Sequence, residues 1–137
     1  MNIPEYQFSN YIDKKLFKLG LKKSKFVKAQ INNDNNIIIQ QNTYIQNISN
    51  KTITIKKGYS LITQDLNNVS IIGELDTTLY VLGKLKGNIY SKGIVELALK
   101  SIVTGDIDCM KFKIYNNKKD QSINPSVYGK LSMGKSS

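Results

Sequence analysis

The sequence predicts an all-β fold of one domain, built as a triangular β-solenoid with about 18 residues per turn. Three observations lead to this prediction: residues 79–90 alternate between apolar and polar side chains, the pattern that starts at Leu79 starts again at Leu97, and glycines recur inside it. Alternation with a period of two is typical of a β-strand that has one buried face. A repeat of fixed length indicates stacked turns, each of which packs against its neighbours.

The repeat is clearest between residues 79 and 107. The positions expected to face inward are Leu79, Val81, Gly83, Leu85, Gly87 and Ile89 in the first copy, and Leu97, Leu99, Ser101, Val103, Gly105 and Ile107 in the second. All of these residues are apolar or small, whereas the intervening residues differ between the copies. Three short strands fit into each turn, and turns stacked about 4.8 Å apart would place equivalent residues in columns. We therefore expect the apolar members to form the core and the glycines to occupy its corners.

The residues before this repeat are expected to supply the opening turns. Ile37–Ile39 adds apolar residues without a clear register, and Ile53 lies in an alternating segment. Gly73 stands closer to Gly87 than a full repeat allows, so the sequence predicts one shortened turn near residues 76–78. An antiparallel sandwich of short strands is the alternative fold, although it does not account for the constant spacing of the repeat.

After the repeat, the alternation continues to Tyr115 and ends in a polar run at 116–120. The chain is therefore expected to divide into a basic N-terminal segment (1–30), a β-helix core of roughly five turns (31–117) and a basic C-terminal tail (118–137).

The N-terminal segment has apolar residues at helical spacing, namely Phe8, Ile12, Leu16 and Leu19. With Asn10 as a cap and Gly20 as a stop, they predict a short helix over about residues 11–19, the alternative being a flexible tail. A basic segment with an apolar stripe can bind an anionic membrane surface. The membrane-binding candidates are Lys14, Lys15, Leu16, Lys18, Leu19, Lys22 and Lys23. The other reading is a solvated tail or a helix that caps one end of the solenoid.

The composition argues against catalysis. The sequence contains no His, Trp or Arg, which removes the commonest general base, a frequent metal ligand and the bidentate phosphate clamp. We expect no catalytic site, metal site, cofactor or small-molecule substrate. The single Cys109 precludes an intrachain disulfide, and no secretory signal is recognised, so a cytoplasmic location is expected.

Two segments, Val81–Ile89 and Ile102–Ile107, resemble the repeat of the bactofilin family of bacterial cytoskeletal proteins. In that family a run of the type apolar-x-Gly-x-apolar-x-Gly-Asn/Asp-Ile recurs on successive turns, and the resemblance covers roughly residues 60–115. It implies a right-handed β-helix, polymerisation through the ends of the helix without nucleotide, and tails that attach to a membrane or to other proteins. The short spacing between Gly73 and Gly87 departs from the family pattern.

The ends of a solenoid are unpaired strand edges, which recruit another chain unless they are protected. The candidate polymerisation contacts are Phe112 and Tyr115 at one end and Ile37 and Ile39 at the other. The sequence thus predicts a scaffold protein that self-assembles into filaments, attached peripherally to the inner face of the cytoplasmic membrane. Its main expected partner is a further copy of itself; cell-envelope and other cytoskeletal proteins are further candidates.

Two other functions have partial support in the sequence. Hexapeptide-repeat acyltransferases share a turn of this length but commonly use a His base, which this chain lacks. A nucleic-acid-binding role is favoured by the net charge of +10 and by eight Tyr residues. However, residues 31–110 carry seven Lys against seven acidic residues, and most aromatic residues are not interleaved with the basic ones, as a stacking surface requires.

Overall fold

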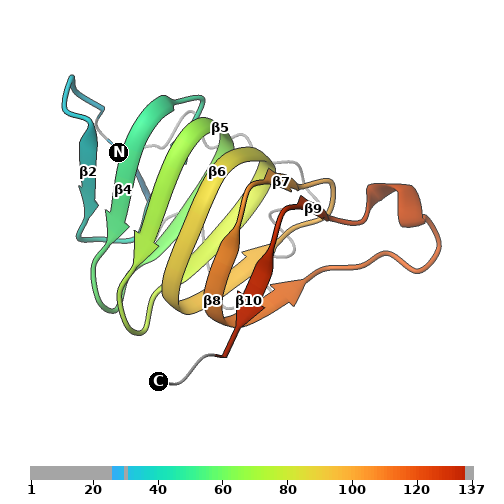
Figure 1. The fold of residues 1–137 in the computed structure, drawn as a ribbon. Coiled ribbons are helices and arrows are strands. Elements are labelled where there is room, and N and C mark those ends of the chain that lie inside the picture. Colours follow the sequence, from blue (N-terminus) through green and yellow to red (C-terminus); the bar gives the residue numbers. More distant parts are fainter. Residues whose placement is uncertain (1–25, 30, 135–137) are drawn as a thin grey trace.

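The computed structural model describes residues 26–29 and 31–134 and shows a β-solenoid of about five turns with about 18 residues per turn (Figure 1). All strand pairs of the described part are parallel. A coil produces parallel pairs because consecutive turns run in the same direction, whereas a sandwich of hairpins produces antiparallel ones. In Figure 1 the nearer strands run downwards while the turns advance to the right, so the coil is right-handed. The predicted fold class is confirmed, and the sandwich alternative is wrong.

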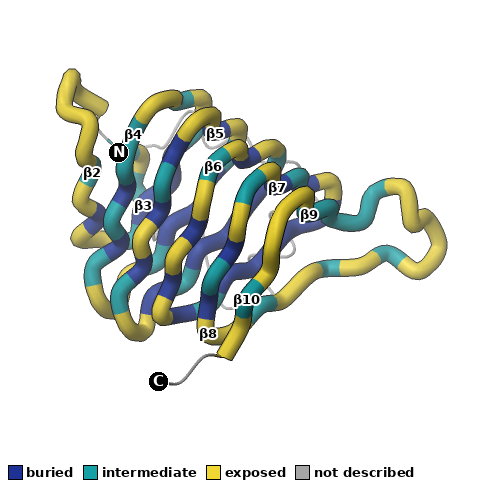
Figure 2. Tube along the Cα trace, in the orientation of Figure 1, coloured by how far each residue is buried: buried dark blue, intermediate teal, exposed yellow. Residues whose placement is uncertain are grey.

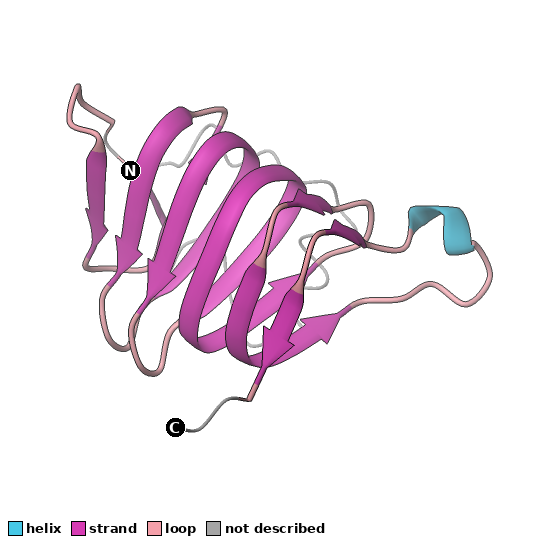
Figure 3. Ribbon diagram, viewed as in Figure 1, coloured by secondary structure: helices cyan, strands magenta, loops and turns pink. Residues whose placement is uncertain are grey.

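The strands bend around the corners of the coil, so that a long strand contributes to more than one face (Figure 3). They are β1 (Val27–Lys28), β2 (Asn36–Ile39), β3 (Thr43–Gln46), β4 (Ser49–Ile55), β5 (Ser60–Gly73), β6 (Thr78–Leu97), β7 (Ile102–Thr104), β8 (Ile107–Ile114), β9 (Ser126–Tyr128) and β10 (Leu131–Met133). Face A stacks β2, β4, β5, β6, β8 and β10. Face B stacks β1, β3, the first part of β5, both ends of β6 and the end of β8. Face C stacks the start of β4 and the middle of β5 and β6 with β7 and β9.

The core is a set of columns inside the coil (Figure 2). On face A, Ile53, Ile71, Ile89 and Ile107 follow one another in register and are all fully buried. The apolar residues of the central repeat are buried as well: Leu79, Val81, Leu85, Ile89, Leu97, Leu99, Val103 and Ile107. Their columns are shared between turns, so each turn contributes apolar area that its neighbours cover.

The register between β5 and β6 corrects one expectation. Gly73 pairs with Ser91, and Val69 pairs with Gly87, so both pairs keep the full spacing of the repeat. The two glycines therefore occupy different corners, and the distance between them along the chain does not measure a turn. The shortened turn predicted near residues 76–78 is wrong.

A shorter register occurs one turn later. On face B the Ile94 N–H donates to the Thr77 carbonyl, whereas the equivalent bond in the turn before runs from the Thr78 N–H to the Tyr59 carbonyl. The bond between positions 94 and 77 bridges a chain segment two residues shorter than the bond between positions 78 and 59. The expected stack of Leu97 on Leu79 is therefore wrong, although both side chains are buried.

The last turn extends the solenoid beyond its predicted boundary. β9 pairs with β7 and β10 pairs with β8, both at a sequence separation larger than that of the repeat. The extra length forms a loop over residues 115–125, which holds the short 3-10 helix η2 (Gln121–Ile123) and projects past the last turn (Figure 1). The predicted tail from residue 118 onward is thus wrong up to residue 134.

The solenoid also begins earlier than expected. β1 pairs with β3, and Phe26 is fully buried, so residues before 31 belong to the coil. The predicted helix over residues 11–19 lies outside the described residues. Within residues 26–29 and 31–134, no helix has the length and hydropathy needed to span a membrane.

Candidate functional site

The interior columns remain uncovered at the carboxyl-terminal end of the coil. Leu131 pairs with the buried Ile107, and Met133 pairs with the buried Cys109, so both hold inward positions. Their side chains are nevertheless 43% and 52% exposed. The difference arises because Ile107 and Cys109 have a further turn beyond them, whereas Leu131 and Met133 belong to the last turn of the described chain.

The other two faces show the same feature at this end. Ile114 pairs with the buried Leu97 but is 40% exposed. Phe112 and Val127 are half-buried and pack against the edge of the core cluster. We call this group the open end, and it consists of Phe112, Ile114, Val127, Leu131 and Met133. It is an apolar surface that an additional turn would bury.

The strands at the open end also have a pairing partner on one side only within the described chain. β9 pairs only with β7, β10 pairs only with β8, and residues 111–114 pair only with the end of β6. An edge of this kind presents a row of N–H and C=O groups to which another strand can add. The open end therefore combines an apolar surface with strand edges on all three faces.

The amino-terminal end is more covered. β1 and β2 are also paired on one side in the described chain. However, Ile39 is buried within the core cluster, Ile37 is half-buried against it, and Phe26 is fully buried. Of the two residues predicted as contacts at this end, only Ile37 has a partly accessible side chain.

One corner of the solenoid is held by a ladder of side-chain hydrogen bonds. The Asn88 Oδ1 accepts from the Asp106 N–H, and the Asp106 Oδ1 accepts from the Lys130 N–H, each at 3.0 Å. Beside it Gly105 lies so close to the turn below that an added Cβ would stand 1.8 Å from the Gly87 carbonyl oxygen. The ladder cannot continue beyond Lys130, because its ammonium group donates hydrogen bonds but cannot accept one.

Tyr115, a predicted contact residue, is directed to the side of the coil. Its hydroxyl donates to the Glu96 Oε1 at 2.5 Å, and the Lys113 Nζ lies 5.1 Å from the centre of its ring. Glu96 lies in the part of β6 that belongs to face B. Tyr115 therefore anchors the start of the projecting loop, and Phe112 is the predicted residue that reaches the open end.

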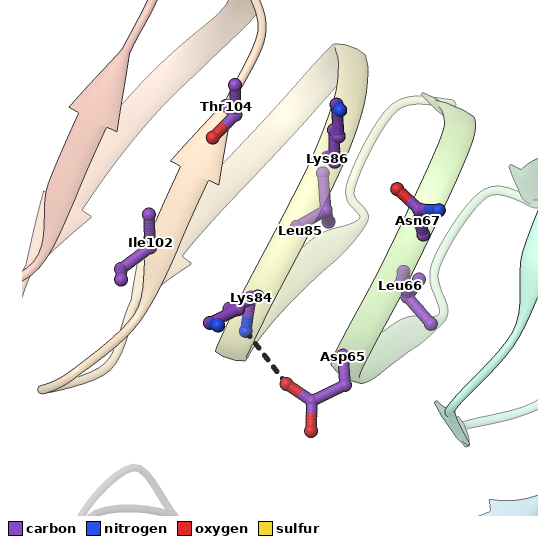
Figure 4. Close-up of a pocket in the computed structure, with 8 residues that line it drawn as sticks. All are labelled: Asp65, Leu66, Asn67, Lys84, Leu85, Lys86, Ile102 and Thr104. Atoms are coloured by element: carbon purple, nitrogen blue, oxygen red, sulfur yellow. Dashed lines mark hydrogen bonds between the residues drawn. The ribbon is translucent and has the colours of Figure 1, made fainter.

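A hollow on face C is the place where a small-molecule site would be sought (Figure 4). It follows from the register shifts between β5 and β6, where the Asp65 Oδ1 accepts from the Lys84 N–H at 3.1 Å. Its lining residues are Asp65, Leu66, Asn67, Lys84, Leu85, Lys86, Ile102 and Thr104. These side chains offer no pairing of a nucleophile with a general base. The described residues also contain no group of three or more His, Cys, Asp or Glu that could hold a metal ion.

The sequence prediction missed most of the open end. A signal was present, because Gly105-Asp106-Ile107 returns as Gly129-Lys130-Leu131, with the same change from a corner to an inward strand position. The longer spacing of this last copy hid the match. The membrane-binding candidates between Lys14 and Lys23 lie outside the described residues.

Comparisons with known proteins add no family to these observations. Neither a scan of protein-family models nor searches among curated proteins and solved structures found a match for this chain. The geometry of the two ends therefore provides the basis for a functional interpretation.

Proposed function

We propose that this chain is a structural scaffold protein that assembles end to end into filaments without a nucleotide. The observation that supports the proposal is the open end, where residues in inward positions remain up to 52% exposed. A second copy placed against this end would cover them and extend the strand ladders. The resemblance of the central repeat to bactofilins is consistent with this function.

Apolar burial alone does not make such a contact stable. Complete burial of a Leu, Ile or Met side chain contributes about 1.5–3 kcal/mol, and the three exposed residues of the open end are already about half-buried. Their total of roughly 2–5 kcal/mol reaches at most the lower end of the 4–15 kcal/mol that association costs. Backbone pairing along the strand edges must therefore contribute, and the proposed contact depends on stacking of whole turns.

A filament requires a contact at each end of the subunit. The carboxyl-terminal end offers the open apolar surface, and the amino-terminal end offers the edges of β1 and β2. A contact that uses only one end would stop at a dimer. Filaments therefore need the weaker amino-terminal contact as well.

The place of such filaments in the cell is a further part of the proposal. We predict a cytoplasmic protein, with peripheral attachment to the inner membrane face as one mode of anchoring. The basic candidates are Lys14, Lys15, Lys18, Lys22 and Lys23, and many copies in a filament would multiply a weak attraction.

The test uses the purified full chain, negative-stain electron microscopy and sedimentation, with and without ATP or GTP. We expect filaments a few nanometres wide under all of these conditions. The double variant Leu131→Lys, Met133→Lys should stay in the supernatant, because two ammonium groups at the open end oppose burial.

The matched control is Ile72→Lys with Tyr90→Lys, two residues that are 41% and 55% exposed on the outer surface of face A. This variant adds the same charge and should still form filaments. Thermal unfolding should show that both variants fold. Wild-type protein that stays monomeric at every concentration would contradict the proposal, as would filaments of the open-end variant.

A further inference from the structure

The outer surface of face A carries a column of exposed apolar side chains. Face A is turned towards the viewer in Figure 1, where its strands follow one another along the coil. The outward column at its centre consists of residues paired in register, namely Ile38, Thr54, Ile72, Tyr90, Asp108 and Ser132. Ile38, Ile72 and Tyr90 are 53%, 41% and 55% exposed. An exposed apolar strip with a polar rim is typical of a protein-interaction site.

Charged residues form the rim on one side of this column. The Lys56 Nζ donates to the Glu74 Oε2 at 2.9 Å, and Lys92 occupies the equivalent position on the turn after Glu74. Hydrogen bonds from Lys56 and from the Lys57 N–H, followed by the Lys92 charge, lower the pKa of the Glu74 carboxyl. Glu74 is therefore ionised at neutral pH, and the sign of the rim charge changes from one turn to the next.

The rim on the other side is polar and mostly uncharged. It contains residues paired in register, namely Asn36, Thr52, Ser70 and Asn88. Amide and hydroxyl groups both donate and accept hydrogen bonds, so this rim can pair with a copy of itself.

A second copy of the chain fits this surface about a two-fold axis that runs along the strands, between β5 and β6. Such an axis keeps the strands of the two copies aligned and reverses the order of their turns. Stacked sheets pack in this way, about 10 Å apart and with nearly aligned strands. Ile72 of each copy would then lie opposite Tyr90 of the other, at the centre of the contact.

The rim charges are complementary in this orientation. Glu74 of each copy would face Lys92 of the other, which gives two ion pairs of opposite sign. Asp108 would face Thr54, whose hydroxyl can donate to the carboxylate. Among the residues of the column and of its two rims, no like charges would oppose each other.

Other orientations bring like charges together. An axis placed on β6 would put Lys92 opposite Lys92, and an axis placed on β5 would put Glu74 opposite Glu74. An axis along the coil, centred on the apolar column, would put Asp108 opposite Asp108. Juxtaposed like charges disfavour an interface. The pattern of charge therefore selects the antiparallel pair with its axis between β5 and β6.

The area of face A indicates where such a contact can operate. Six strands about 4.8 Å apart, each exposing the width from Ser70 to Glu74, give a flat surface of roughly 400 Å². Stable interfaces bury about 800 Å² on each partner. Two isolated subunits would thus be held weakly, whereas a filament presents face A many times and multiplies the contact.

We propose that face A is a lateral interface through which the subunits of two neighbouring filaments pair with their coils antiparallel. Ile72 packs against Tyr90 of the other filament, and Glu74 forms an ion pair with Lys92 of the other filament. The inference rests on the proposed function, since the pairing requires filaments that repeat the face.

The first test is the width of filaments of the purified full chain in negative-stain electron microscopy. We expect the wild type to form paired filaments. Ile72→Lys combined with Tyr90→Lys should give single filaments of about half that width, because ammonium groups oppose burial. Single filaments of the wild type would overturn this inference and leave the proposed function standing, whereas a wild type without filaments would overturn both.

The matched control for this test is Asn67→Lys combined with Thr104→Lys. Both residues are exposed on the outer surface of face C, and both pair in register with Lys86. This variant adds the same charge as the face A variant and should keep the paired filaments. Loss of pairing in both variants, or in neither, would overturn the inference.

The second test is charge reversal, which examines the orientation of the pair. Glu74→Lys alone or Lys92→Glu alone should lower the fraction of paired filaments by about fivefold or more, because like charges then face each other twice. The double variant should restore pairing, since the charges are only exchanged. It also lacks the bond between Glu74 and Lys56, so the restoration cannot come from that bond.

Thermal unfolding should show that all three charge variants fold. Pairing that is unchanged in the single variants would overturn the inference. The same conclusion would follow if the double variant stayed unpaired.

Discussion

The two ends of the solenoid are built from the same repeat, but only one of them leaves the core uncovered. At the carboxyl-terminal end, Leu131 and Met133 hold inward positions with about half of their surface exposed. At the amino-terminal end, Ile39 is buried and Ile37 is half-buried. The repeat alone therefore does not determine how much apolar surface each end exposes. That surface depends on how far the first and last turns are covered.

In the proposed assembly, this difference indicates which contact between subunits would be stronger. The largest apolar area is covered when two carboxyl-terminal ends meet, since each brings its own open end to the contact. Such a contact is isologous, and it must be joined by a weaker amino-terminal contact before a filament can grow. The two ends can therefore be tested separately.

The largest expected effect concerns the assembly state. Ile37→Lys should abolish filaments but leave dimers joined through their carboxyl-terminal ends, because the open end is intact. Leu131→Lys combined with Met133→Lys should remove these dimers as well. Analytical ultracentrifugation over a range of concentrations measures both outcomes. If Ile37→Lys also gives only monomers, the subunits stack head to tail.

The next effect is on the stability of the monomer. Ile107 and Leu131 are partners in register, so alanine substitutions compare the same position inside the coil and at its end. Ile107→Ala should lower the free energy of unfolding by about 2–5 kcal/mol, because it leaves a cavity. Leu131→Ala should cost less than about 1 kcal/mol, because nearly half of its surface already contacts water. Urea denaturation of dilute protein measures both, and equal losses would mean that the last turn is covered.

The smallest expected effect is a pH dependence of the free energy of unfolding. It arises from Cys109, the buried partner in register of Met133. Burial, together with the Asp108 carboxylate, raises the pKa of Cys109 from about 9 to about 11. The thiol must remain protonated in the folded state, so its contribution is complete below pH 9 and is lost as the pH rises towards 11. Two pKa units correspond to about 2–3 kcal/mol as an upper limit.

Met133, which pairs in register with Cys109, provides the control position. In a Cys109→Ala background, Met133→Cys places a thiol at the open end, where water solvates the thiolate. Urea denaturation at pH 8 and pH 10.5 should show the steeper loss of stability in the wild type. A loss of equal size in both proteins would assign the pH dependence to other groups.

The fold was predictable because its signal is periodic. The alternation over residues 79–107 defined buried positions that the structure bears out, including Leu85 and Val103. The register was less predictable, since Gly73 and Gly87 look alike in sequence but serve different corners. Corner lengths vary between turns, and alternation within a strand carries no information about them.

The open end was missed because its position in the sequence departs from the repeat. The loop over residues 115–125 separates the last turn from the repeat, which conceals the equivalence of Leu131 with Ile107.

The loop over residues 115–125 also has a geometric consequence for a docked neighbour. It projects past the last turn in Figure 1, with its start held by the hydrogen bond between Tyr115 and Glu96. In the proposed assembly, a neighbour that approaches the open end would meet this overhang on one side only. In the proposed filament, the loop would permit some rotations of the neighbour about the long axis and would block others, so that the azimuth between adjoining subunits would be set outside the hydrophobic columns.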